Sequence, residues 1–92
     1  MDRADCISSI STFTSNLNQI AKCVCDSIKA NDIASTVDCI HKFYTGYGAI
    51  SAAILSYNGI LTEGEVLKYL TSITEIEKEF KKTTNELSKK LK

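Results

Sequence analysis

The sequence predicts an all-α protein, an up-down-up antiparallel three-helix bundle that forms a single domain over residues 1–92. Proline, which interrupts helices, is absent from the entire sequence. Apolar residues recur at steps of three and four along three long segments, whereas no segment alternates apolar and polar residues as a half-buried strand would. The connections between these segments are short, so neighbouring helices are expected to be antiparallel.

The first helix is predicted over residues 5–29 from one apolar stripe. Its other faces carry Ser, Thr, Asn and Gln, which are poor helix formers, so packing must supply most of its stability. Asn31 or Asp32 is expected to cap the helix that follows. The stripe consists of Ile7, Ile10, Phe13, Leu17, Ile20, Val24 and Ile28.

The second helix is predicted over residues 32–57, ending at Asn58 and Gly59, which tolerate the left-handed conformation that closes helices. Gly46 and Gly48 lie inside it, and each weakens a helix by ~1 kcal/mol relative to alanine. We expect a continuous helix, with a break over residues 45–48 as the alternative. The predicted inward stripe consists of Ile33, Val37, Ile40, Tyr44, Tyr47, Ile50 or Ser51, Ile54 and Tyr57.

The third helix is predicted over residues 62–91, where Thr62 followed by Glu65 has the spacing of a capping box. Acidic residues dominate its first half and lysines its second half, an order that complements the helix dipole. Its apolar seam has the heptad spacing of a coiled coil and is expected to form core or a second contact surface. The seam consists of Val66, Tyr69, Ile73, Ile76, Phe80, Thr83 and Leu87.

Charge and composition argue against several classes of partner. The formal net charge is zero, so the positive field that holds nucleic acid is missing and no nucleic-acid binding is predicted. Residues 43–62 carry no charge, but they are too rich in Gly, Ser, Thr and Asn for a membrane span. The charged residues that follow Met1 do not resemble a secretory signal. We therefore expect a cytoplasmic protein, with secretion as the alternative if Met1 is not native.

No catalytic, cofactor or metal site is predicted. His41 is the only histidine, and it lies beside Cys39 on one helix without a third group to orient it, so we expect no enzymatic activity. Cys23, Cys25, Cys39 and His41 are the only clustered metal-ligand types. Helix positions two apart point roughly 200° from each other, so Cys23 and Cys25 cannot both bind one metal ion while that helix stays regular.

The four cysteines have two interpretations. The first is that Cys6, Cys23, Cys25 and Cys39 are free, buried or half-buried thiols of a protein in a reducing compartment. The alternative is a disulfide between Cys23 and Cys39, which fall at the same height on antiparallel helices. That bond would close a loop of about fifteen residues and contribute ~3 kcal/mol on a chain-entropy model.

The uncharged stretch, residues 43–62, is the main functional signal in the sequence. Two neighbouring helices can cover only part of it, and loss of charge with enrichment in tyrosine is typical of interface cores. We therefore predict a non-enzymatic protein–protein interaction module (an adaptor, assembly subunit or inhibitor) that acts through the second helix, most simply by self-association as a homodimer. The alternative is a secreted carrier of a small apolar ligand stabilised by Cys23–Cys39. The predicted contact residues are Tyr44, Tyr47, Ala52 and Tyr57.

Overall fold

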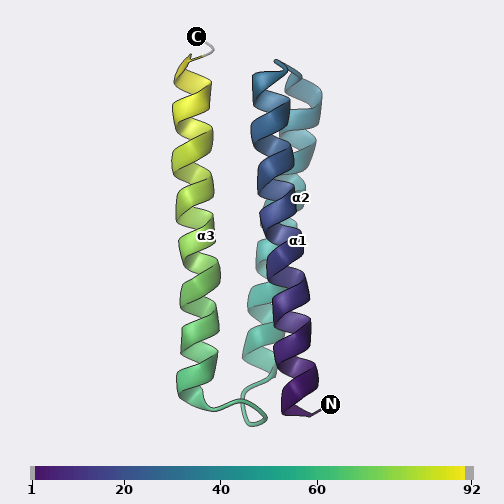
Figure 1. Ribbon diagram of the computed structural model, residues 1–92, viewed down its shortest axis with the longest axis vertical. Coiled ribbons are helices and arrows are strands. Elements are labelled where there is room, and N and C mark those ends of the chain that lie inside the picture. The colour runs from purple at the N-terminus through teal and green to yellow at the C-terminus, as the bar shows by residue number, and fades with distance from the viewer. Residues whose placement is uncertain (1, 91–92) are drawn as a thin grey trace.

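The computed structural model describes residues 2–90 and confirms an all-α three-helix bundle. The helices are α1 (Arg3–Lys29), α2 (Ile33–Ser56) and α3 (Glu63–Lys90). They run up, down and up along a narrow rod of 48 × 19 × 15 Å, with the two ends of the chain at opposite ends of the rod (Figure 1). The predicted helices match these bounds to within two residues wherever the structure describes them; residue 91 lies outside the described residues.

Side-chain caps set the start of each helix. The Asp2 carboxylate accepts a hydrogen bond of 2.9 Å from the backbone N–H of Asp5 at the start of α1. Asp32 does the same for Ser35 at the start of α2, at 3.1 Å. Its carboxylate also accepts a bond from the Ser35 hydroxyl, and together these bonds lower the pKa of Asp32. Of the two predicted caps, Asp32 therefore holds the position, and Asn31 forms the turn with a positive φ of 57°.

The predicted capping box at the start of α3 is present. The backbone N–H of Thr62 donates to the Glu65 carboxylate, and the backbone N–H of Glu65 donates to the Thr62 hydroxyl, both at 3.1 Å. The Glu65 carboxylate also pairs with Arg3 of α1. One acidic side chain therefore both caps α3 and links it to the beginning of the chain.

The segment between α2 and α3 turns at Gly59, where φ is 101°, a value that favours glycine. Leu61 closes this segment against the core and is buried. Upstream, α2 is continuous through Gly46 and Gly48, so the predicted alternative of a broken helix is not observed.

The core runs the length of the rod, and α1 and α2 pack against each other more extensively than α3 packs against either. The seam predicted for α3 faces this core. Three predicted members of the α2 stripe do not, because Ile33, Val37 and Tyr44 are 74%, 51% and 41% exposed. Phe43, which the predicted stripe omits, is fully buried instead. The buried apolar residues are Cys6, Ile10, Leu17, Val24, Ile28, Phe43, Ile50, Ile54, Tyr57, Leu61, Val66, Ile73 and Phe80.

Candidate functional site

A hollow of about 310 Å³ lies between α1 and α2, and we call it the α1–α2 groove. None of the residues that line it is charged. Its floor consists of Leu17 and Ile50, which belong to the core. The complete lining is Phe13, Asn16, Leu17, Ile20, Gly46, Ala49, Ile50 and Ala53.

Small residues on one side of α2 create this groove. Gly46, Ala49 and Ala53 are three and four positions apart, so they lie above one another on the helix. A methyl group added at Gly46 would sit 3.6 Å from Cδ1 of Leu17, which is ordinary contact distance. The absence of a side chain at Gly46 therefore leaves the apolar floor open to the surface.

Phe13 of α1 stands on the rim of the groove and is 41% exposed. The sequence stripe had placed it in the core. Next to the groove, α2 presents an outer face without charge, which confirms that only part of the uncharged stretch is covered by the bundle. This outer face of α2 consists of Thr45, Gly48, Ala49, Ala52, Leu55 and Ser56, all of them exposed.

The four predicted contact residues do not form one surface. Ala52 is exposed on the outer face of α2, and Tyr47 is half-buried against the core. Tyr57, which is both a member of the predicted stripe and a predicted contact residue, directly follows the last turn of α2 and is only 9% exposed. Tyr57 therefore belongs to the hydrophobic core and does not offer a contact surface.

Tyr44 is partly exposed and turned toward α3. Its hydroxyl donates a hydrogen bond of 3.1 Å to the Glu77 carboxylate. Partial burial, followed by this bond and the nearby negative charge, raises the pKa of Tyr44 above its usual value of 10. Tyr44 therefore joins α2 to α3 on the side of α2 away from the α1–α2 groove.

The residues that the sequence analysis missed are those of the opposite wall, Phe13 and Asn16 of α1. Which side of α1 faces α2 depends on helix pairing, which no local pattern contains. One signal was present in the sequence: small residues at 46, 49 and 53 recur at helical spacing beside two larger core positions.

All four cysteines are free thiols, with Cys6 buried and Cys23 exposed. Cys23 and Cys39 nevertheless lie near one side chain. The pKa of Lys42 is raised chiefly by its hydrogen bond and charge interaction with Asp38, and to a smaller degree by the Cys39 and Cys23 thiols. Cys39 lies three residues before Lys42 on α2, Cys23 lies on α1, and the disulfide between the two cysteines stays a prediction.

Residues 2–90 form neither a metal-ion site nor a membrane span. No group of three or more His, Cys, Asp or Glu side chains in that range is arranged to hold a metal ion. None of the helices described there is both long and apolar enough to cross a membrane.

Comparison with known proteins gives no relative. No protein-family model, no curated protein and no solved structure matches this chain.

Proposed function

We propose that this protein is a non-enzymatic protein–protein interaction module that uses the α1–α2 groove together with the outer face of α2. The observation that carries the proposal is a charge-free apolar hollow with the half-exposed ring of Phe13 on its rim. Depletion of charge around aromatic and small apolar side chains is typical of the buried centre of an interface. An adaptor, an assembly subunit or an inhibitor could each use such a face.

The partner that fits this face most simply is a second copy of the chain. In a two-fold dimer, the same patch meets itself, so any charge near its centre would face a like charge. The α1–α2 groove and the outer face of α2 carry no charge, and the chain has zero formal net charge. Phe13 also stands beside a hollow, so each copy offers both an aromatic side chain and a groove that can receive one.

The area that a stable interface buries supports a dimer that uses both the α1–α2 groove and the outer face of α2. A standard interface buries about 800 Å² per partner, roughly an eighth of the 5950 Å² surface of this chain. The groove alone is smaller than that. The outer face of α2 continues from the groove and supplies the remaining area, with small residues that let two helices approach closely.

Sedimentation equilibrium over a range of protein concentrations tests self-association. The native chain should show a monomer–dimer equilibrium, with dimer present at tens of micromolar. Ala49→Glu should weaken the dimer about 100-fold or more, because the two-fold axis brings two uncompensated charges into one apolar interface.

Ala34→Glu is the matched control, because Ala34 is an exposed alanine of the same helix outside the groove and the outer face. This variant should dimerise like the native chain. A native chain that stays monomeric at tens of micromolar, or equal weakening by both variants, would rule out self-association through this face.

A further inference from the structure

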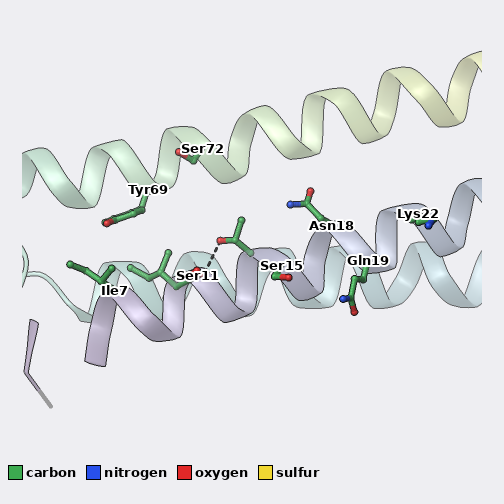
Figure 2. A pocket seen from close by; sticks show the side chains of 10 residues that line it. Ile7, Ser11, Ser15, Asn18, Gln19, Lys22, Tyr69 and Ser72 are labelled. Carbon is green, nitrogen blue, oxygen red and sulfur yellow. Dashed lines mark hydrogen bonds between the residues drawn. The ribbon is translucent and has the colours of Figure 1, made fainter. Parts of the chain in front are cut away.

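A second groove follows the seam between α1 and α3, and we call it the α1–α3 groove. It consists of two hollows of about 750 and 390 Å³. Asn18 and Lys22 line both of them, so the two hollows are continuous. Figure 2 shows the larger one, with Tyr69 of α3 facing Ile7 and Ser11 of α1 across the opening.

The floor of the α1–α3 groove is apolar. Ile10 and Phe80 at its base belong to the buried core. Ile7, Tyr69 and Ile76 pack against that core but remain only half-buried. An apolar stripe laid along this floor would remove further apolar area from water and so favour binding.

The two rims of the groove carry opposite charges that do not meet. Lys22 lines the smaller hollow from α1, and Glu75 and Glu79 line it from α3. Among the described residues, neither Lys22 nor Glu79 has an ion-pair partner within 4.0 Å, and Glu75 has only an exposed contact of 3.9 Å with Lys78. Among residues 2–90, no ion pair within 4.0 Å therefore joins the two rims across the groove.

We propose that the α1–α3 groove docks an amphipathic α-helix of a different protein. The apolar stripe of that helix would cover the floor, its basic flank would lie along Glu75 and Glu79, and an acidic group would face Lys22. The lining extends along α1 from Ile7 to Cys25, a length of about 27 Å, which matches a helix of about 18 residues. Charge complementarity determines the orientation of the helix in the groove.

A second folded copy does not fit this groove as well. Most of the apolar stripe of each helix already faces the core of its own bundle, so a folded copy offers only short exposed apolar stretches to insert. The α1–α3 groove is lined by other residues than the α1–α2 groove, and this inference does not depend on the proposed dimer.

Two synthetic 18-residue helices provide the test, used as probes with the full chain. Both carry the same Leu and Ala stripe. One has Lys on one flank and Glu on the other, so that a single direction of docking places Lys against Glu75 and Glu79 and Glu against Lys22. The other has Glu on both flanks, so that either direction of docking places Glu against Glu75 and Glu79. Fluorescence anisotropy should show that the native chain binds the first about three- to tenfold more tightly, as expected for two exposed charge pairs.

Charge reversal on α3 should invert this preference. In Glu75→Lys/Glu79→Lys, the peptide with Glu on both flanks should bind more tightly than the peptide with one Lys flank. In Glu63→Lys, which places the same change at an exposed position at the start of α3 outside the groove, the original preference should persist. Equal affinities of the native chain for both peptides, or no binding of either at millimolar concentration, would overturn the inference.

A variant that fills the α1–α3 groove distinguishes peptide binding in this groove from binding elsewhere on the chain. Ser72 lines the groove and Thr71 does not, although both are exposed neighbours on α3. Ser72→Trp should weaken binding of the Lys-flanked peptide at least tenfold, and Thr71→Trp should leave it unchanged, with circular dichroism confirming that both variants fold. Equal affinities of the two variants, or a peptide footprint on the α1–α2 groove in hydrogen exchange, would also overturn it.

Discussion

The rings of Phe43 in α2 and Phe80 in α3 stack with their centroids 3.8 Å apart and their planes 11° from parallel. Tyr44 sets its ring edge-on to both, at 5.4 Å from Phe43 and 6.0 Å from Phe80. Among the pairs of helices, α2 and α3 have the least extensive contact, so this aromatic cluster contributes much of what holds them together. Each ring pair stabilises the fold by about 1 kcal/mol beyond the burial of its apolar area.

Replacing either stacked ring should destabilise the bundle. Phe43→Leu and Phe80→Leu should each lower the free energy of unfolding by about 1–2 kcal/mol, because a smaller side chain leaves unfilled space in the core. The double variant should lose about 1 kcal/mol less than the sum, since the stacking is lost only once. Urea unfolding followed by circular dichroism measures all three, and strict additivity would contradict a stabilising stack.

The capping box should make stability depend on pH. The hydrogen bond from Arg3, followed by that from the Thr62 backbone, holds the pKa of Glu65 below its usual value of 4.5. The folded chain therefore binds this proton less readily than the unfolded chain, so the contribution is present above about pH 4.5 and is lost as the pH falls through the lower folded value.

Urea unfolding between about pH 6 and pH 3 should thus show stability falling toward acid, and Glu65→Gln should reduce the slope. Part of the slope remains in that variant, because the pKa of Asp32 is lowered as well. Glu63→Gln is the control, since no side-chain hydrogen bond of Glu63 to a described residue is present. If stability depended on pH equally steeply in Glu65→Gln, the capping box would not contribute to the pH dependence.

Replacing two of the glycines with alanine should change the stability of the protein in opposite directions. At Gly48, no atom lies within 4 Å of the added methyl group and the backbone is helical, so Gly48→Ala should stabilise the protein by up to ~1 kcal/mol. At Gly59, the φ of 101° is strained for alanine, so Gly59→Ala should destabilise it by about 1 kcal/mol or more. Thermal unfolding at a concentration where only monomer is present measures the stability of both variants. A destabilised Gly48→Ala variant would contradict the open surroundings of Gly48.

The cysteines should react with alkylating reagent in the order of their exposure. In protein purified without reductant, Cys23 should be modified first and Cys25 and Cys39 more slowly, whereas Cys6, at 0% exposure, should react only after unfolding. Mass spectrometry of tryptic peptides assigns each site. Recovery of Cys23 and Cys39 as a linked peptide would instead support the disulfide and the secreted-carrier alternative.

The helices and their ends follow from the sequence alone, because they depend on neighbours within one turn. Asp32 and the Thr62–Glu65 pair cap their helices through bonds between residues three apart, and the positive φ of Gly59 suits the only residue type without a side chain. Apolar periodicity gave the number of helices for the same reason, since it needs no knowledge of the partner helix.

Which aromatic side chain enters the core depends on how the helices pack together. Phe43 and Tyr44 are adjacent, about 100° apart on α2, and either could have faced inward on the local pattern. Packing against Phe80 selected Phe43 and left Tyr44 at the edge. The pairing of helices likewise left Phe13 exposed and produced the two grooves, because a groove consists of residues from two helices and its shape depends on the distance between them.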